Sequence, residues 1–292
     1  MTFTGTFTDG YWWSNDSLRL HYRDYAGPSE AAANRPVVIC LPGLTRNARD
    51  FDGLAERLAG QWRVLAVEFR GRGESAYAKD AMTYVPLTYV QDVEALLTAL
   101  GLTRVILIGT SLGGIVAMIL ASMDRERIAG VVLNDIGPVI EPRGLERIRG
   151  YVGRTGPWPT WLHAARWLAE NNATSYPNYG MPDWLVMAKR LFRLTSAGRI
   201  VADYDKKISE PFRLAGGEAG QDLWPVIAGM ATIPTLIIHG ALSDVLSEAT
   251  TQAMVARMPL AKYVDVAGVG HAPTLDEPEA GAAIDTFLSP LA

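Results

Sequence analysis

A serine flanked by glycines is the residue of this chain that is best placed to act as a nucleophile. Ser111 lies in the pentapeptide Gly109–Gly113, which follows the apolar run Val105–Ile108 and precedes a predicted helix over Gly114–Ala121. G-x-S-x-G between a strand and a helix is the sequence form of a nucleophile elbow. Such a turn projects the hydroxyl from the sheet edge. It also places the next backbone N–H at a helix N-terminus, where it can stabilise an oxyanion.

A serine hydroxyl needs a base to take its proton, and the chain offers four histidines. His271 lies in the glycine-rich segment 268–273, after the last predicted strand and before the last predicted helix. This position predicts an imidazole at the carboxyl edge of the sheet, where open α/β sheets bind ligands. His271 is therefore the predicted base. His21 is interpreted as structural and His163 as a surface or lid residue, while His239 fits either a packing or a pocket role.

The composition is that of an ordinary globular enzyme or binding protein. The chain has 292 residues, a net charge of -4 and no stripe of Lys and Arg, so we expect no nucleic-acid partner. Its single cysteine, Cys40, provides no disulfide framework. Residues 1–10 lack the basic start and apolar stretch of a signal peptide. No apolar run reaches the length of a membrane span, so we expect a cytoplasmic protein without a membrane partner.

Strand and helix patterns alternate along most of the chain, which predicts a mostly parallel central sheet flanked by helices. Two opening antiparallel strands are predicted within residues 11–25. Strands are predicted at residues 37–41, 64–67, 105–108, 131–133, 235–238 and 263–266, and the first two are short apolar runs typical of strands buried on both faces.

The alternation stops after Asp135. Residues 140–229 contain helical segments, no clear strand, and five of the eight tryptophans. We interpret this stretch as a helical cap inserted into one core made of residues 1–139 and 230–292. An apolar pocket beneath a cap would bind a small molecule, and the predicted pocket residues are Trp158, Trp161, Trp184 and His239.

Five segments carry a resemblance to a known family. They are Leu41–Leu44, Arg70–Ser75, Gly109–Gly114, Gly240–Asp244 and Gly270–Pro273. In this order they resemble the α/β-hydrolase superfamily, in its capped branch of serine esterases and lactonase-like enzymes. They span most of the chain outside the predicted cap. The resemblance implies the α/β-hydrolase fold and a Ser-His-Asp triad in the chain order serine, acid, histidine.

The resemblance assigns a role to each matching residue. Ser111 matches the nucleophile and His271 the general base. Asp244, just past a predicted strand, matches the acid that orients the imidazole. Asp135 is the alternative acid, because it follows the preceding strand, where some members of the superfamily carry theirs. We favour Asp244.

The resemblance also assigns an oxyanion hole to the backbone N–H groups of Leu44 and Leu112. Two positions depart from the family pattern. Pro42 stands where the family often has histidine, which puts any contacts of that histidine in doubt but leaves the Leu44 donor. Glu68 stands where the family usually has aspartate at the start of the loop beside the site.

No cofactor or metal site is expected. Residues Gly71–Ala76 fit a relaxed dinucleotide-binding pattern, but no helical periodicity follows them. The sequence contains neither a phosphate-binding loop of the Walker type nor a cluster of His, Cys and carboxylates with metal-ligand spacing.

The favoured function is hydrolysis of carboxylic esters or lactones through an acyl-enzyme. A C–C bond hydrolase and a cofactor-free perhydrolase are alternatives with the same triad. A small-molecule receptor on a hydrolase fold is the non-enzymatic alternative. The sequence leaves the natural substrate and the oligomeric state open.

Overall fold

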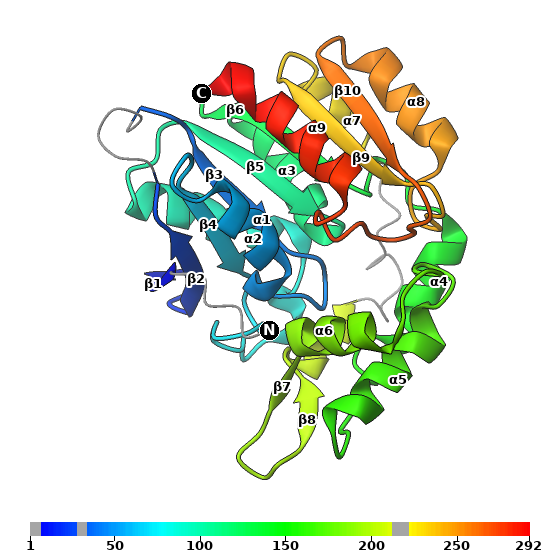
Figure 1. Cartoon of the computed structure of the whole chain (residues 1–292). Helices are drawn as coiled ribbons and strands as arrows, with labels where there is room; N and C mark the ends of the chain where they lie inside the picture. The colour runs from blue at the N-terminus through cyan, green and yellow to red at the C-terminus, as the bar shows by residue number, and fades with distance from the viewer. Residues whose placement is uncertain (1–6, 28–33, 212–221) are drawn as a thin grey trace.

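A central eight-stranded sheet forms the middle layer of the molecule, with helices on both faces (Figure 1). The computed structural model describes residues 7–27, 34–211 and 222–292. The strands are β1 (Phe7–Trp13), β2 (Arg19–Tyr25), β3 (Val37–Leu41), β4 (Val64–Glu68), β5 (Val105–Thr110), β6 (Ile128–Asn134), β9 (Thr235–Gly240) and β10 (Ala261–Val266). Their order in the sheet is β1-β2-β4-β3-β5-β6-β9-β10.

The sheet is antiparallel at one edge and parallel elsewhere. β1 and β2 form a hairpin, and β2 pairs antiparallel with β4. All pairings from β4 to β10 are parallel. The prediction of a mostly parallel sheet with an antiparallel opening hairpin is confirmed. Parallel strands all point the same way, so the loops after β3, β5, β6 and β9 meet at one edge.

Both faces of the sheet are covered by apolar helices. Along β3, Ile39 and Leu41 belong to the apolar core on one side, and Val38 and Cys40 to the core on the other. The alternation follows from the two-residue period of a strand. The helices α2 (Pro86–Ala99), α3 (Leu112–Met123), α7 (Trp224–Gly229) and α8 (Glu248–Arg257) contribute to the first core. The helices α1 (Asp52–Leu58) and α9 (Pro278–Leu288) contribute to the second.

The segment that interrupts the alternation lies beyond one end of the sheet (Figure 1). It contains α4 (Pro142–Tyr151), α5 (Trp161–Asn172) and α6 (Met181–Leu191), of which α5 and α6 pack together. We call the described residues 140–211 and 222–229 the cap segment. That the cap is a separate domain stays a prediction. Residues 212–221 of the predicted cap lie outside the described residues, as do residues 1–6 of the N-terminal stretch that is predicted not to be a signal peptide.

The expectation that the cap segment has no strand is wrong. β7 (Phe192–Leu194) and β8 (Ile200–Ala202) form a small antiparallel sheet, separate from the central one. Each strand has three residues, and such a length is too short for a period-two pattern to show in the sequence.

Several backbone hydrogen bonds attach the cap segment to the core, and two of them lie in the loops that follow β4 and β10. The N–H of Gly73 donates to the carbonyl of Asp203 at 3.0 Å, beside the loop that follows β4. The N–H of Gly270 donates to the carbonyl of Ser175 at 2.6 Å, in the loop that carries the predicted base. Within the three described stretches, no helix has the length and apolar character needed to cross a membrane.

Candidate active site

The turn between β5 and α3 has the strained geometry of a nucleophile elbow. Ser111 adopts φ 53° and ψ −117° directly before the first residue of α3. A left-handed φ is unusual for a residue other than glycine and indicates a tight turn. A Cβ at Gly113 would overlap the carbonyl oxygen of Leu41, and one at Gly109 would overlap the backbone of Gly113. The two glycines of the motif are therefore required by close backbone contacts.

His271 reaches the serine from the loop between β10 and α9. Its Nε2 lies 2.9 Å from the Oγ of Ser111, which is hydrogen-bonding distance. The loop passes close over the end of β9, because a Cβ at Gly240 would lie 2.6 Å from the carbonyl oxygen of Gly270. The structure thus brings the predicted nucleophile and the predicted base together from positions 160 residues apart.

The carboxylate that contacts His271 belongs to Asp135, so the preference for Asp244 is corrected. Asp135 follows β6 directly and is fully buried, and its Oδ2 lies 2.7 Å from the Nδ1 of His271. The same carboxylate accepts hydrogen bonds from the N–H of Gly240 at 2.8 Å and the Oγ of Ser243 at 2.6 Å. Three contacts fix its orientation toward the imidazole.

Asp244 is engaged elsewhere. It accepts two hydrogen bonds from Arg147 on α4, from Nε at 2.6 Å and from Nη2 at 2.7 Å. Although burial opposes ionisation, this contact and the charge of Arg147 lower the pKa of Asp244. Both aspartates follow strands that end at the same sheet edge. The sequence alone could not show that a cap-segment arginine binds one of them while the imidazole meets the other.

The predicted oxyanion donors lie on either side of the serine. Leu112 is the first residue of α3, and Leu44 lies in the loop after β3. That loop approaches the elbow closely, since a Cβ at Gly43 would lie 3.7 Å from the Cβ of Ser111. Proline at position 42 does not prevent this approach.

Arg72 supports the same loop and was not singled out from the sequence. Its side chain is fully buried, and its Nε donates to the carbonyl of Leu44 at 2.9 Å. Its Nη1 donates to the carbonyl of Arg70 at 2.7 Å and to the hydroxyl of Tyr89 at 2.8 Å. The signal available in the sequence was its place within the Arg70–Ser75 segment.

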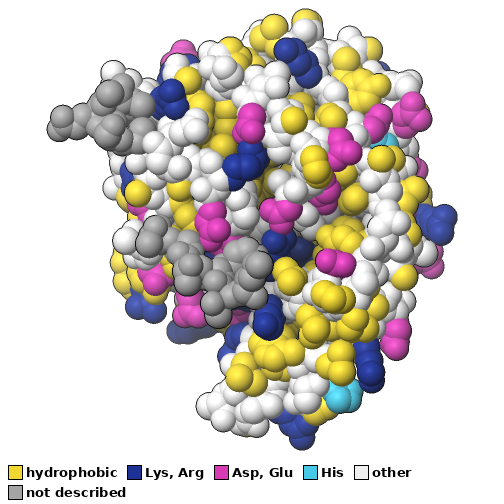
Figure 2. All heavy atoms as spheres, in the orientation of Figure 1, with side chains coloured by type: hydrophobic (Ala, Val, Ile, Leu, Met, Phe, Trp, Pro, Cys, Tyr) yellow, Lys and Arg dark blue, Asp and Glu magenta, His cyan; other side chains and the backbone are white. Residues whose placement is uncertain are grey.

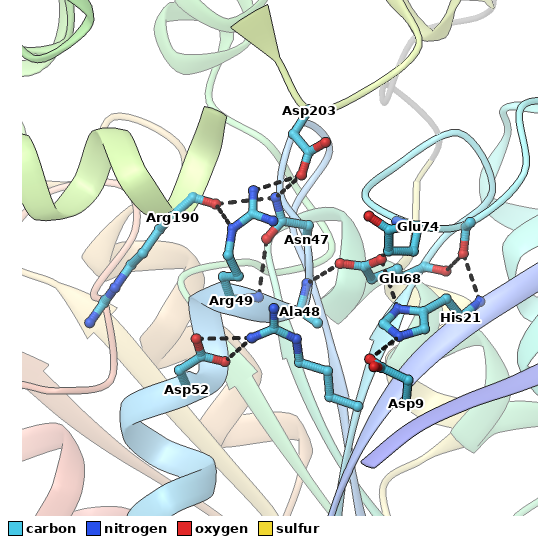
Figure 3. Close-up of polar contacts among 12 residues, drawn as sticks. Asp9, His21, Asn47, Ala48, Arg49, Asp52, Glu68, Glu74, Arg190 and Asp203 are labelled. Carbon is cyan, nitrogen blue, oxygen red and sulfur yellow. Dashed lines mark hydrogen bonds and ion pairs between the residues drawn. The ribbon is translucent and has the colours of Figure 1, made fainter. Parts of the chain in front are cut away.

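Glu68, the second departure from the family pattern, joins three parts of the core (Figure 3). Its carboxylate accepts hydrogen bonds from the N–H of Glu74 at 2.6 Å and the N–H of Ala48 at 3.3 Å. It also lies 2.9 Å from the Nδ1 of His21, whose Nε2 contacts Asp9 at 2.9 Å. Burial alone would lower the pKa of His21, but the two carboxylates outweigh it and raise that pKa.

A second polar network in Figure 3 connects the core to the cap segment. The carboxylate of Asp203 accepts hydrogen bonds from Arg49 at 2.6 Å and from Asn47 at 3.2 Å. Both core residues also donate to the backbone carbonyl of Arg190, at 2.9 and 3.1 Å. These contacts hold the end of α6 and the segment after β8 beside the loop that follows β3.

A pocket lies between these loops and the helices of the cap segment. Ser111, His271 and Leu44 line it, together with the aromatic side chains of Trp167 and Phe192. The residues around the pocket therefore include a candidate nucleophile, a candidate base and a carboxylate that contacts this base, which are groups that acyl transfer needs.

The four predicted pocket residues are corrected, because none of them lines this pocket. Trp158 packs behind it, with ring centroids 5.3 Å from Trp167 and 4.5 Å from Phe192. Trp161 is partly buried in the same apolar core. Helical periodicity identified aromatic faces, but it could not show which face meets the core and which meets the cavity.

Trp184 and His239 also serve packing roles. Trp184 is buried against Tyr176 and Tyr179. His239 lies at the end of β9, where its Nδ1 is 2.7 Å from a carboxylate oxygen of Asp265 and its Nε2 is 3.0 Å from the carbonyl of Leu246. Both ring nitrogens are therefore occupied within the fold.

The face drawn in Figure 2 shows basic and acidic side chains interspersed, with hydrophobic side chains gathered over the cap segment. Exposed apolar residues of that segment include Met181 and Val186 on α6. No large patch of one charge appears on this face.

The chain is similar to proteins of a known family along most of its length. The model of the "Alpha/beta hydrolase family" matches residues 38–284. A 3-hydroxybutyrate-oligomer hydrolase from Cupriavidus necator is 33% identical over 280 residues, which are 93% of each chain. The crystal structure of an alpha/beta hydrolase from Novosphingobium aromaticivorans has a TM-score of 0.92 and 53% identity, covering 97% of this chain and 98% of its own. A 2-(acetamidomethylene)succinate hydrolase from Mesorhizobium japonicum is 25% identical, over 81% of each chain.

Proposed function

The chain belongs to the alpha/beta hydrolase family, and we propose that it hydrolyses carboxylic esters with Ser111 as nucleophile. The observation that carries this proposal is the placement of His271, whose imidazole lies 2.9 Å from the serine oxygen and 2.7 Å from the buried Asp135. A hydrogen-bonded chain of this kind converts an alcohol into an attacking group.

The reaction follows from these contacts. The Oγ of Ser111 attacks the ester carbonyl while the Nε2 of His271 takes its proton, and Asp135 stabilises the resulting imidazolium. The N–H groups of Leu44 and Leu112 receive the oxyanion. The alkoxide leaves with the proton from His271, and the acyl group stays on the serine. Water, deprotonated by the same imidazole, then releases the carboxylic acid and restores the serine.

The relatives support an ester as the bond that is cleaved. A 3-hydroxybutyrate oligomer is joined by ester bonds, and the hydrolase named for it is similar along nearly the whole chain. A lactone is a cyclic ester and fits the same chemistry. The C–C hydrolase and perhydrolase alternatives need the same triad, but none of the described residues that line the pocket makes a contact that specifically favours them. We further propose that the cap segment forms the wall that receives the acyl or alcohol group.

Replacement of the nucleophile tests the proposal. We expect Ser111→Ala to lower kcat for p-nitrophenyl acetate by about 10⁵-fold or more, and to abolish covalent labelling by a fluorophosphonate. Ser196→Ala, at an exposed serine between β7 and β8, is the matched control and should behave like the wild type. Full turnover by Ser111→Ala would refute the mechanism. A wild-type protein that labels once but never turns over would instead indicate a receptor.

A further inference from the structure

The pocket beside Ser111 is lined by more positive charge than a neutral ester requires. Its charged lining residues are Arg46, Arg147, Arg190 and Asp50, that is three cations and one anion besides the catalytic imidazole. Placing guanidinium groups in a partly desolvated cavity costs free energy unless they interact with an anion. Asp50, Asp244 and Asp276 pair with these three arginines, but the ester-cleaving machinery does not explain why three guanidinium groups line the cavity.

Arg46 keeps part of its guanidinium available to a ligand. It lies two residues after the predicted oxyanion donor Leu44 and is 24% exposed at its side chain. Its Nε and Nη2 donate to Asp50, whereas its Nη1 donates to no protein atom within residues 7–27, 34–211 and 222–292. Burial disfavours the charge, but Asp50 outweighs burial and raises the pKa of Arg46.

Arg147 is held by an aspartate in the same way. It projects from α4 and gives Nε and Nη2 to Asp244, so its Nη1 likewise has no acceptor in the described part of the chain. Its side chain is 21% exposed. Arg147 lines the pocket and Asp244 does not, so the counter-ion lies behind the cation as seen from the cavity.

The two guanidinium groups act on the same part of the pocket. Burial raises the pKa of Tyr151, and the positive charges of Arg147 and Arg46 each offset part of that rise. Tyr151 lines the pocket, and its hydroxyl has no hydrogen-bond partner among the residues that the structure describes. A raised pKa keeps this hydroxyl protonated at neutral pH, so that it can donate a hydrogen bond.

Resting on the proposed ester hydrolysis, we propose that Arg46 and Arg147, with the hydroxyl of Tyr151, bind a free carboxylate of the substrate. Nη1 groups and a phenol are the donors that a carboxylate accepts in charge-assisted hydrogen bonds. The substrate class is then an ester that also carries a carboxylate, either on the alcohol part, as in an acylated hydroxy acid, or on the acyl part, as in a monoester of a dicarboxylic acid.

Matched substrate pairs test this inference. The first pair is 3-acetoxybutanoate and 3-acetoxybutanamide, which differ only in the charge at the alcohol part. The second pair is monoethyl glutarate and its terminal amide, which differ at the acyl part. We expect the carboxylate member of at least one pair to have a kcat/KM about 10- to 100-fold higher, the range that a charge-assisted hydrogen bond confers. The pair that shows the preference identifies the side of the ester that faces the arginines.

Variants locate the preference. Arg46→Met and Arg147→Met should each reduce the carboxylate-to-amide ratio of kcat/KM toward one. Arg143→Met, which removes an exposed arginine from the same helix α4, is the matched control and should retain the wild-type ratio. Should Arg147→Met fail to fold once Asp244 loses its partner, Arg46→Met and calorimetric binding of both pair members to Ser111→Ala give the same test.

The outcomes separate this inference from the proposed function. If p-nitrophenyl acetate and all four esters are untouched by the wild type, ester hydrolysis itself fails. If the wild type cleaves both members of each pair equally well, ester hydrolysis stands and the carboxylate site is refuted. A preference that survives in both Arg46→Met and Arg147→Met also refutes it.

Discussion

Exchange of the Asp135 carboxylate for an amide gives the sharpest test of the triad. In Asp135→Asn the new oxygen can accept the N–H of Gly240 only if it takes the place of Oδ1, where that hydrogen bond is 2.8 Å long. The new NH₂ then lies at Oδ2, 2.7 Å from the Nδ1 of His271 and 2.6 Å from the hydroxyl of Ser243, which can accept from it. The imidazole must accept at Nδ1 and carry its proton on Nε2, the atom that should deprotonate Ser111.

The opposite amide orientation is disfavoured by the same contacts. It would turn an N–H toward the N–H of Gly240 and leave two buried donors unpaired, at a cost of about 1–3 kcal/mol each. Either way the negative charge that stabilises the imidazolium is lost. We therefore expect kcat to fall by about 10⁴-fold, or about 5 kcal/mol in activation free energy. Asparagine tolerates the left-handed φ of 54° at position 135, so the turn itself should survive.

The assay is kcat for p-nitrophenyl acetate, with circular dichroism and a thermal melt to show that each variant is folded. Asp244→Asn is the matched control. It removes a carboxylate from the neighbouring strand end, and we expect it to lower kcat by less than about tenfold, since Asp244 contacts Arg147 rather than the imidazole. The assignment of Asp135 as the acid would be overturned if folded Asp244→Asn lost more kcat than Asp135→Asn. It would also be overturned if Asp135→Asn kept a tenth of the wild-type kcat.

Two further predictions concern stability and the elbow. Gly113→Ala should lower the free energy of unfolding by about 1–3 kcal/mol or more and depress kcat, because the new Cβ would overlap the carbonyl of Leu41. Gly150→Ala on α4 meets nothing within 4 Å and should instead stabilise by about 0.5–1 kcal/mol in urea titrations; equal effects would contradict the close-contact argument. Because the pKa of His21 is raised in the folded protein, its contact with Glu68 stabilises the folded state to the full extent only when the pH is below the ordinary histidine pKa of about 6.5. The stability advantage of the wild type over His21→Gln should therefore shrink as the pH rises from about 6.5 through the higher pKa of the folded state, and a difference independent of pH would refute this.

The core of the fold could be predicted because its signals are local. The strand–turn–helix around Ser111 is specified by a buried apolar run, two glycines and an apolar helix within about twenty residues. The starts of α8 after Ser247 and of α9 at Pro278 carry equally local signals, namely a capping serine and a proline at the first helical position.

The acid and the pocket wall could not be assigned in this way. Asp135 and Asp244 both follow strands at one sheet edge, and only the path of α4, which carries Arg147, separates their partners. Trp158 and Trp167 lie on adjacent parts of the cap segment, yet only Trp167 lines the cavity. Such choices depend on contacts between distant segments, which a periodicity within one helix does not record.

The main-chain hydrogen bonds between the cap segment and the core bear on how ligands are exchanged. One of them joins Gly73 to Asp203 and another joins Gly270 to Ser175, so the cap segment is attached at the loop that follows β4 and again at the loop that carries His271. A rigid-body opening of the cap segment would break at least one of these hydrogen bonds and displace the loop that carries it. This architecture favours ligand exchange through small side-chain displacements, with the loops that carry Gly73 and His271 staying in place.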